Sequence, residues 1–271
     1  MTHVRIPSDL IRQAWSDVLH GDLVSPRGHE TLEVVNWSCT VRDPSVVPFT
    51  IPGRAGLNPF IGAVEALQLI GQTHAPELIR QKCESLYRFT DRGIFDGGYG
   101  IRAFGQLGRV ADLLAADPDS RQAVATIHDG NVDLLRVTKD VPCTLSLQFM
   151  VRNEKLCLRV TMRSNDVWLG LPYDIVQFTL LQHAMATALG REVGWYHHAV
   201  GSLHMYERDR LKVEMALTDI SLDDNSVIDG WHGDGWATVS RTARRILSDE
   251  NTSWYTDMTS LEKHLSRLIW D

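Results

Sequence analysis

The 271 residues of this chain are 44% hydrophobic and 23% charged, proportions typical of a globular protein with one substantial core. The net charge of −7 gives no electrostatic reason for binding a polynucleotide, so we expect no nucleic-acid partner. The apolar stretches are too short to span a membrane, and the start of the chain lacks the pattern of a secretory segment. We therefore expect a cytoplasmic protein with no membrane partner.

The four cysteines show none of the spacings typical of metal ligands, so we expect no metal site and reduced thiols. They are Cys39, Cys83, Cys143 and Cys157. The adjacent His197 and His198 also favour an ordinary structural role, because neighbouring residues of a strand point to opposite faces.

The first half of the chain predicts an alternation of helices with one long strand. Apolar residues at helical spacing, or alternating with polar ones, mark these elements. In chain order, we expect a capped helix at 8–15, a strand at 31–41, a Pro/Gly-rich connection at 44–59, helices at 61–71 and 76–87, and a glycine-rich loop at 92–100.

The second half predicts a hairpin followed by a long apolar helix. We expect a turn at 117–120, a strand at 123–127, strands at 144–151 and 155–162 joined by a turn at 152–154, a helix at 175–189, and short strands near 195–204 and 211–219. Helices and strands are interleaved irregularly, which favours the α+β class. Since the chain shows no repeat and no low-complexity linker, we expect residues 1–271 to form a single domain.

Cys143 is the candidate nucleophile. A buried cysteine is most often a small apolar core residue, and we assign that role to the other three cysteines. Cys143 differs because it follows Pro142 at the start of a predicted strand, with Arg163 one hairpin later. A nearby guanidinium lowers the pKa of a thiol and so favours the reactive thiolate.

Arginines on loops and strand ends are candidate phosphate ligands. Arg163 and Ser164 are adjacent, so a guanidinium fork and a hydroxyl could bind one phosphate. Arg121 follows the turn at 117–120, and Arg27 lies in a second predicted loop. Any single arginine is more often a solvated surface residue, so these assignments depend on the wider pattern.

Three acids occupy informative positions. Asp166 and Asp174 flank a turn that contains Gly170. Asp174 also precedes the predicted apolar helix, where it could simply cap the helix or act in a site. Glu65 is the one acid in the apolar helix at 61–71, a costly placement unless the carboxyl group is paired or used.

Taken together and in order, these motifs resemble the thymidylate synthase family. The resemblance covers most of residues 20–210 and is densest over 117–206. The matching positions are Glu65, Tyr99, the segment Asp117 to Arg121, Pro142-Cys143, Gln148-Phe149, the run from Arg163 to Pro172, and His204-x-Tyr206.

The resemblance implies an α+β domain with a large mixed sheet flanked by helices, and a homodimer packed through that sheet. It implies that Cys143 adds to carbon 6 of a pyrimidine nucleotide, whose carbon 5 then takes a one-carbon unit from 5,10-methylenetetrahydrofolate. The roles that it implies are phosphate binding by Arg27, Arg163, Ser164 and the partner subunit's Arg121, sugar binding by His204 and Tyr206, substrate contact by Tyr99, folate contact by Asp166 and Gly170, and proton transfer through Glu65.

One departure from the family points to a different base. The family's uracil-reading asparagine, in Pro-Phe-Asn-Ile, is replaced here by Asp174 in Pro172-Tyr173-Asp174-Ile175. An amide complements the donor at N3 and the acceptor at O4 of uracil, whereas a carboxyl group can accept from the exocyclic amine of cytosine and share a proton with N3. This change resembles the deoxycytidylate and cytidylate hydroxymethylase branch.

Other departures favour a hydroxymethylated product. Thr144, Met162, Gln122 and Ser202 replace the usual histidine, glutamine, second phosphate arginine and aspartate, and 88–98 contains no tryptophan of the kind that guides hydride transfer in methylating members. We therefore expect a cytidylate 5-hydroxymethylase acting on dCMP or CMP, with folate as co-substrate. The alternatives are a divergent thymidylate synthase, a dUMP hydroxymethylase, and a catalytically inactive nucleotide-binding protein.

Overall fold

The computed structural model describes residues 2–83, 90, 95–221, 229–248 and 258–270. Within these ranges the strands are β1 (Thr2–Val4), β2 (Asp22–Val24), β3 (Thr31–Val41), β4 (Val124–Thr126), β5 (Thr144–Arg152), β6 (Lys155–Asp166) and β7 (Glu192–Tyr206). The helices are α1 (Pro7–Val18), α2 (Pro59–Gly71), α3 (Pro76–Lys82), α4 (Tyr99–Arg102), α5 (Gln106–Ala116), α6 (Gly130–Asp133), α7 (Leu171–Ala188), α8 (Arg210–Thr218), α9 (Trp236–Ser248) and α10 (Ser260–Trp270). None of the described helices has the length and hydropathy needed to cross a membrane.

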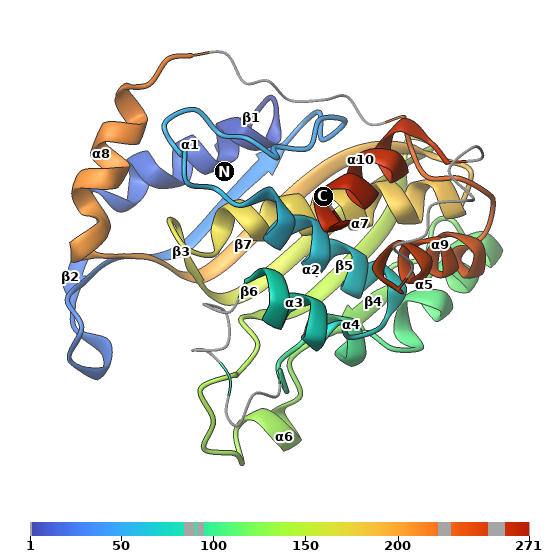
Figure 1. Cartoon of the computed structure of the whole chain (residues 1–271), viewed down its shortest axis with the longest axis horizontal. Coiled ribbons are helices and arrows are strands. Elements are labelled where there is room, and N and C mark those ends of the chain that lie inside the picture. Colours follow the sequence, from blue (N-terminus) through green and yellow to red (C-terminus); the bar gives the residue numbers. More distant parts are fainter. Residues whose placement is uncertain (1, 84–89, 91–94, 222–228, 249–257, 271) are drawn as a thin grey trace.

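The strands form one mixed sheet of seven strands (Figure 1). Six follow the order β1-β3-β7-β6-β5-β4, and β2 pairs with β3. The central pair β6 and β7 is parallel, whereas β3–β7 and β5–β6 are antiparallel. This arrangement confirms the expected α+β class with a large mixed sheet and helices.

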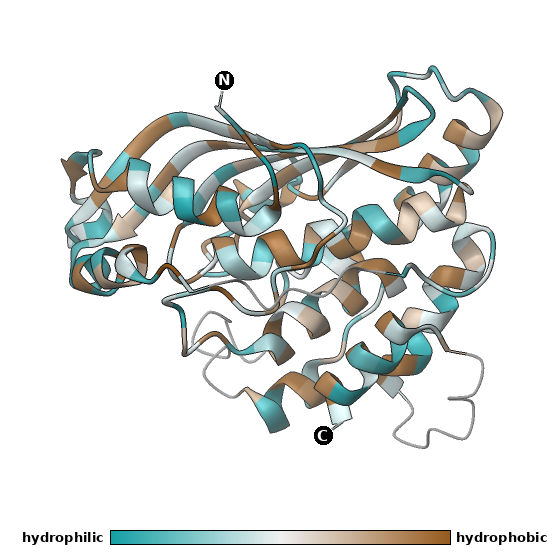
Figure 2. Ribbon diagram, turned by 90° about the horizontal axis from the view of Figure 1, so that it is seen from above, coloured by the Kyte–Doolittle hydropathy of each residue, from teal (hydrophilic) through white to brown (hydrophobic). Residues whose placement is uncertain are grey.

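The helices lie mostly on one side of the sheet, which Figure 2 shows nearly edge-on. α7 packs on β6 and β7, and α2 packs on α7 as a further layer. The side chains of β5 alternate between the two faces of the sheet: Leu147 and Phe149 are buried, whereas Gln148 and Met150 are partly exposed. The face of the sheet away from the helices therefore keeps accessible side chains.

Several elements match the expectations from the sequence. β3 covers the predicted strand from Thr31 to Val41, and α2 covers the apolar helix with two more residues at its start. The turn between β5 and β6 places Asn153 and Glu154 at φ of 51° and 62°. Such left-handed residues suit a two-residue hairpin, so the predicted turn is confirmed.

Other predicted boundaries were incomplete. The helix expected at 76–87 is α3, which ends at Lys82, and 84–87 lie outside the described residues. The loop expected at 92–100 includes the start of the short helix α4 at Tyr99, and 92–94 also lie outside the described residues. The strand near 195–204 is the longer β7, which pairs with a neighbour on each side.

The strand predicted at 211–219 was wrong, because this segment forms α8. Its buried residues, Val213 and Ala216, are three apart and face α1, which is helical spacing rather than alternation. The side chain of Arg12 fixes the end of α8 by donating to the carbonyl oxygens of Ala216 and Leu217 at 3.3 and 2.9 Å.

Of the two roles open to Asp174, that of capping α7 does not hold. The helix begins at Leu171, with Gly170 at the capping position and proline in the first turn. The backbone amide of Asp174 already donates to the carbonyl oxygen of Gly170 at 3.0 Å, and the side chain of Asp174 is buried. Its carboxyl group is therefore available for other contacts.

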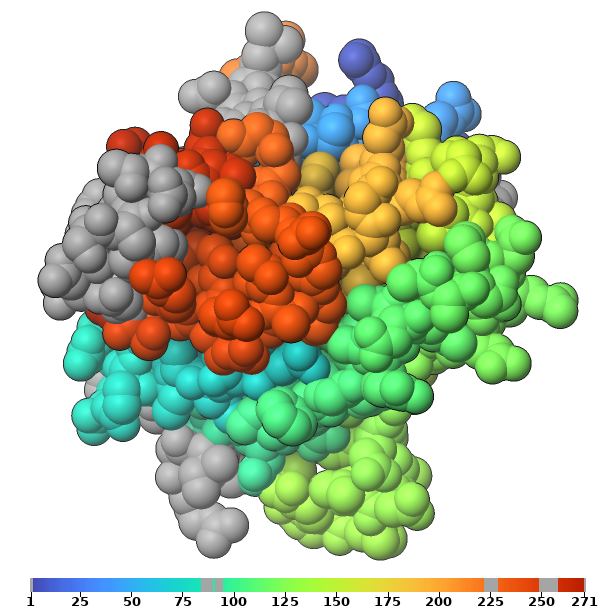
Figure 3. All heavy atoms as spheres, turned by 90° about the vertical axis from the view of Figure 1, so that its right-hand side faces the viewer, coloured from blue at the N-terminus to red at the C-terminus, as the bar shows by residue number. Residues whose placement is uncertain are grey.

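The described residues 229–248 and 258–270 cover part of the helical layer. Figure 3 shows α9 in orange against the green α5, and α9 also packs on α2. Arg244 of α9 donates to the carbonyl oxygen of Gly71 at 2.8 Å, and Trp270 of α10 donates to that of Ile246 at 2.8 Å. These C-terminal helices therefore hold α2, the helix that carries Glu65.

A buried ion pair joins α4 to the segment that leads toward Cys143. The guanidinium of Arg102 donates two hydrogen bonds of 2.7 Å to the carboxylate of Asp133, and the two side chains are 12% and 1% exposed. Arg102 also donates to the carbonyl oxygens of Asp96 and Ile127. Because removal of one partner leaves the other charge buried and unpaired, this pair is a strong constraint on both segments.

We predict that Asp133→Ala lowers the free energy of unfolding by about 3 kcal/mol, because Arg102 loses its buried counter-ion. The matched control is Asp112→Ala, which removes an exposed pair with Arg109 at 3.8 Å and should change stability by less than about 0.5 kcal/mol. Chemical denaturation of both variants measures the difference, and equal losses would contradict the structural role of the buried pair.

Candidate active site

Four of the predicted site residues come together beneath the sheet from four different segments. Glu65 lies in α2, Tyr99 begins α4, Cys143 directly precedes β5, and Asp174 lies in the first turn of α7. Each interacts electrostatically with at least one of the others, with Asp174 common to all. The hydroxyl of Tyr99 also accepts from the backbone amide of Thr144 at 3.3 Å, next to the thiol.

The two carboxyl groups of this cluster are held in an environment that disfavours their charge. Burial raises the pKa of Glu65 to about 8, and the neighbouring Asp174 adds to the shift. Burial also raises the pKa of Asp174 to about 7, although hydrogen bonds from Gln177 and Asn165 oppose it. Both acids can therefore gain and lose protons near neutral pH, which suits general acid-base chemistry.

The thiol of Cys143 is balanced between two opposing effects. Burial raises its pKa, while the guanidinium of Arg163 lowers it. Arg163 also fixes the loop in front of Cys143, because its Nε and Nη2 donate to the carbonyl oxygens of Pro142 and Val141 at 3.0 and 2.9 Å. Its Nη1 makes no hydrogen bond with another described residue and remains available to an anion.

Ser164 has different neighbours from Arg163. Its hydroxyl lies 3.2 Å from Nδ1 of His204, at the paired ends of β6 and β7. The ring of His204 in turn packs edge-on against Tyr206, with centroids 5.9 Å apart. The structure thus places three predicted substrate ligands, Ser164, His204 and Tyr206, in one row along these strand ends.

Asp166 lies beside this row with one carboxylate oxygen unused. Its Oδ1 accepts from the backbone amides of Trp168 and Leu169 at 2.8 Å, which forms the turn that leads to Gly170. Its Oδ2 is buried and has no hydrogen-bond partner in the described parts of the chain. Burial raises the pKa of Asp166, so a donor placed at Oδ2 would stabilise its charged form.

Arg54 is a neighbour of Asp166 that the sequence did not single out. Its guanidinium lies 4.0 Å from the ring centroid of Trp168, and it donates to the carbonyl oxygen of Trp168 at 3.2 Å. Burial lowers the pKa of Arg54, whereas Asp166 is among the groups that favour its charge. No spacing or motif in the sequence indicated this contact, because residue 54 lies within the Pro/Gly-rich connection.

The remaining two predicted phosphate ligands are not joined to Cys143 by any contact that the described residues make. Arg27 is exposed in a short turn at φ 54°, although the nearby His29 packs against Tyr206. Arg121 is exposed before β4, where its carbonyl oxygen accepts from Gln148 at 3.3 Å. The described part of this chain therefore brings the thiol of Cys143 and the acids together but leaves Arg121 apart.

Behind Asp174 lies a chain of buried polar side chains that sequence reasoning missed. Gln177 donates to Asp174 Oδ1 at 2.8 Å. On the other side, Asn165 contacts both Asp174 and Nε2 of His198, the latter at 3.1 Å from its Nδ2. Nδ1 of His198 is 2.7 Å from the hydroxyl of Tyr196. The adjacent histidines do differ, as expected, because His197 instead meets the hydroxyl of Thr40.

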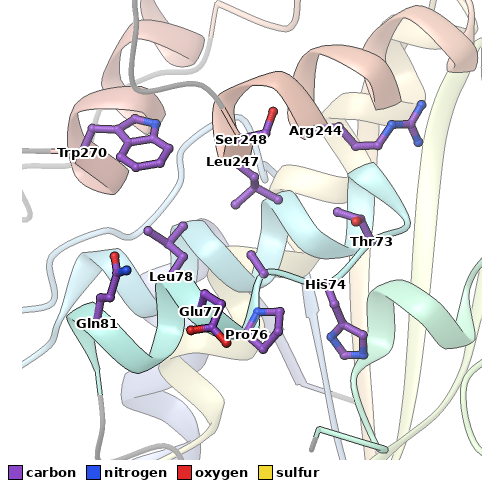
Figure 4. A pocket seen from close by; sticks show the side chains of 11 residues that line it. Thr73, His74, Pro76, Glu77, Leu78, Gln81, Arg244, Leu247, Ser248 and Trp270 are labelled. Carbon is purple, nitrogen blue, oxygen red and sulfur yellow. The ribbon is translucent and has the colours of Figure 1, made fainter.

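A separate pocket of about 640 Å³ lies between α3 and the C-terminal helices (Figure 4). It is lined by Thr73, His74, Ala75, Pro76, Glu77, Leu78, Gln81, Arg244, Leu247, Ser248 and Trp270. None of the predicted site residues contributes to it. We therefore place the candidate active site at the Cys143 cluster rather than in this pocket.

Comparison with known proteins gives the family. The family model described as thymidylate synthase matches residues 77–224, more than half of the chain. The chain is 34% identical over 222 residues to the deoxyuridylate hydroxymethyltransferase of Bacillus phage SP01, covering 75% of this chain and 58% of that protein. It is 31% identical over 164 residues to the enzyme of the same name from Pseudomonas phage M6, covering 58% and 47%.

A thymidylate synthase from Mycoplasma genitalium is 30% identical over 123 residues, or 45% of this chain and 42% of that protein. The chain thus spans about half the length of the curated relatives that it matches. The family match confirms the resemblance found in the sequence: the chain belongs to the thymidylate synthase family.

We predict that the buried acids make the protein less stable as pH rises toward 9. A raised pKa means that the folded state binds more protons than the unfolded state between the ordinary carboxyl range and about pH 8. Their contribution to stability is therefore lost as pH rises through that window. Glu65→Gln should make this decline less steep. The difference in free energy of unfolding, variant minus wild type, should therefore increase between about pH 5 and about pH 9.

The control for this measurement is Glu214→Gln, which changes an exposed acid of α8. It should leave the decline with pH as it is in the wild type. The same dependence of unfolding free energy on pH in all three proteins would show that Glu65 is charged in the folded state throughout. This would contradict the raised pKa of Glu65.

Proposed function

We propose that this protein is a cytidylate 5-hydroxymethylase. It would transfer a one-carbon unit from 5,10-methylenetetrahydrofolate to carbon 5 of dCMP or CMP, and addition of water would give the 5-hydroxymethyl nucleotide and tetrahydrofolate. The observation that carries the proposal is the buried carboxyl group of Asp174, beside the thiol of Cys143 and with a pKa near 7.

The chemistry of Asp174 suits cytosine better than uracil. A protonated carboxyl group has one donor and one acceptor and complements either base, so the discrimination lies in the ionised form, which accepts from the exocyclic amine of cytosine and can share a proton with N3. Uracil presents a donor at N3 and an acceptor at O4, so an ionised Asp174 would face the oxygen O4 without a proton between them. A mismatch of this kind in a buried site costs about 1–3 kcal/mol for each contact.

The same proton supports the attack by Cys143. When the thiolate adds to carbon 6, negative charge moves through the ring toward N3. The proton of Asp174 neutralises this charge as it develops, which lowers the energy of the addition. Arg163 serves the other end of the step, since it favours the thiolate and fixes the loop before it.

The co-substrate fits the unused oxygen of Asp166. A pterin ring carries N–H donors, and Asp166 Oδ2 is a buried acceptor with no partner among the described residues. When bound, methylenetetrahydrofolate would supply the one-carbon unit. Gly170 lies next to Asp166, because a Cβ atom added at Gly170 would be 3.5 Å from the carbonyl oxygen of Asp166. Asp166 and Gly170 together are called the folate corner below. Glu65, with its pKa near 8 and partial exposure to water, would move protons to and from the reacting carbon.

We further propose that residues 1–271 form a single domain and that two copies pack through the accessible face of the sheet. Arg163, Ser164 and Arg27 would bind the phosphate, together with Arg121 of the partner subunit. Two observations support this arrangement. The helices leave one face of the sheet partly exposed (Figure 2), and Arg121 is exposed just before the edge strand β4. His204 and Tyr206 would bind the sugar, and Tyr99 the base side of the nucleotide.

The second candidate is a deoxyuridylate hydroxymethylase. The observation that favours it is the name of the two phage relatives, which are deoxyuridylate hydroxymethyltransferases. The two candidates share the thiol, the acids and the folate corner, and they differ in the base that Asp174 must recognise.

We predict that the wild-type protein prefers dCMP or CMP to dUMP and that Asp174→Asn shifts this preference toward dUMP. The amide reverses the hydrogen-bonding roles at two positions of the base, so the ratio of kcat/KM values should change by about a hundredfold or more. Helix capping does not complicate the result, because Gly170 occupies the capping position of α7.

The control variant is Asp17→Asn, which makes the same chemical change in α1, where the carboxylate accepts from Trp37 and Gln13. It should leave the preference where it was. A wild type that already prefers dUMP would replace the cytidylate proposal with the deoxyuridylate one.

The dimer proposal predicts that two inactive variants restore activity when mixed. Cys143→Ala lacks the nucleophile, and Arg121→Ala lacks the arginine given to the partner's site. Exchange of subunits would produce one intact site in each mixed dimer, so up to about half of the sites in such dimers would regain tritium release from carbon 5 of labelled substrate. Each variant mixed with itself is the control. A monomer in sedimentation, or no recovery after exchange, would overturn the shared site.

A further inference from the structure

We infer that Asn165, His198 and Tyr196 form a buried hydrogen-bond chain that reverses its direction when Asp174 gains or loses its proton. These three would be positioning residues, which hold the acid in place in both of its protonation states. The inference rests on the proposed function for the substrate that Asp174 serves. Asn165 also donates from Nδ2 to the sulfur of Met162 at 3.0 Å, a weak contact that a reversal of the chain gives up.

The chain is closed off from solvent. Asn165 is 2% exposed, and His198 and Tyr196 are fully buried. Buried polar groups need hydrogen-bond partners, and a partly satisfied network is unfavourable. Burial lowers the pKa of His198 to about 3, with a smaller contribution from His197, and keeps its ring neutral near pH 7.

One direction of the chain fits a protonated Asp174. Nδ2 of Asn165 then donates to Nε2 of His198 at 3.1 Å, and the ring proton on Nδ1 of His198 is donated to the Tyr196 oxygen at 2.7 Å. The carbonyl Oδ1 of Asn165 is left without a donor in the described parts of the chain. This oxygen and Oδ2 of Asp174 both lie beside Gly170. A Cβ atom added at Gly170 would be 3.3 Å from Asn165 Oδ1 and 3.6 Å from Asp174 Oδ2. A proton on Asp174 would supply the missing donor.

The opposite direction fits an ionised Asp174. A half-turn of the Asn165 amide exchanges its donor and acceptor, so the amide then donates to the carboxylate. Its carbonyl oxygen accepts from Nε2–H of His198, and the hydroxyl of Tyr196 donates to Nδ1. The ring carries one proton in both cases, on Nδ1 or on Nε2, and tyrosine keeps its own. The only net change is the proton that leaves Asp174.

This reversal has a direct use at the proposed site. An acid that gives a proton to N3 of the base must become a buried carboxylate, which is costly unless a donor replaces the lost proton. Asn165 provides that donor by rotating its amide, and Asn165, His198 and Tyr196 all stay neutral as it does so. Gln177 donates to the other oxygen, Oδ1, and is compatible with either state.

Other titratable groups face the same acid and must be separated from it in a test. Asp174 interacts with Glu65 of α2, Tyr99 of α4, Cys143 before β5 and Tyr196 of β7, and His198 interacts with its neighbour His197. Among these, Glu65 titrates closest to Asp174, with a pKa of about 8 against about 7.

The test is the tautomer of His198, read by nitrogen NMR on the full chain with isotope-labelled histidine and no substrate. We expect Nδ1–H at about pH 5 and Nε2–H at about pH 9, with the ring neutral throughout and a midpoint set by Asp174. His198→Phe identifies the signal by its loss. In Asp174→Asn the tautomer should no longer change with pH, and in Asn165→Ala the change should also be lost. In Glu65→Gln it should persist.

A His198 tautomer that stays the same across this range in the wild type would overturn the inference. So would a change that survives in Asp174→Asn or Asn165→Ala, because the chain would then not connect the acid to the ring. The readout needs no nucleotide, so its failure is distinct from that of the proposed function. If the enzyme rejects cytidylates while His198 still switches, the chain stands and the substrate assignment falls.

Discussion

Two carboxyl groups held close together in a space with little water are the constraint on which the rest of the site depends. Glu65 comes from α2 and Asp174 from α7, and the packing of α2 on α7, and of α7 on β6 and β7, sets their separation. The C-terminal helices α9 and α10 hold α2 in that position. Burial raises the pKa of both acids to near neutrality. The helix packing that buries them therefore also sets the pH range in which they can exchange protons.

Much of the fold could be predicted from local patterns, and the errors have physical reasons. β3 alternates clearly along its length, and the apolar helix α2 is unambiguous, so both were found within two residues. α8 was mistaken for a strand because Leu211, Val213 and Met215 alternate with charged residues, and only its packing against α1 shows which apolar residues are buried. The start of α7 was placed too late because Pro172 suggested a loop, although proline is well suited to the first turn of a helix.

The candidate site likewise contains residues that the sequence could single out and residues that it could not. Cys143, Glu65 and Asp174 could be singled out because each is chemically out of place in its own segment. The buried chain of Asn165, His198 and Tyr196 could not, because each of these residues is unremarkable until parallel pairing of β6 with β7 and the packing of α7 bring them together. The roles of Arg27 and Arg121 stay predictions, since a single subunit places neither against the thiol.

The most direct test of the account is the product formed by the wild-type protein from dCMP and from CMP, with methylenetetrahydrofolate and heavy-oxygen water. We expect a 5-hydroxymethylcytidylate whose new hydroxyl oxygen comes from the water, formed by a covalent route that requires the thiol of Cys143. A 5-methyl product, or turnover of dUMP alone under the same conditions, would contradict it.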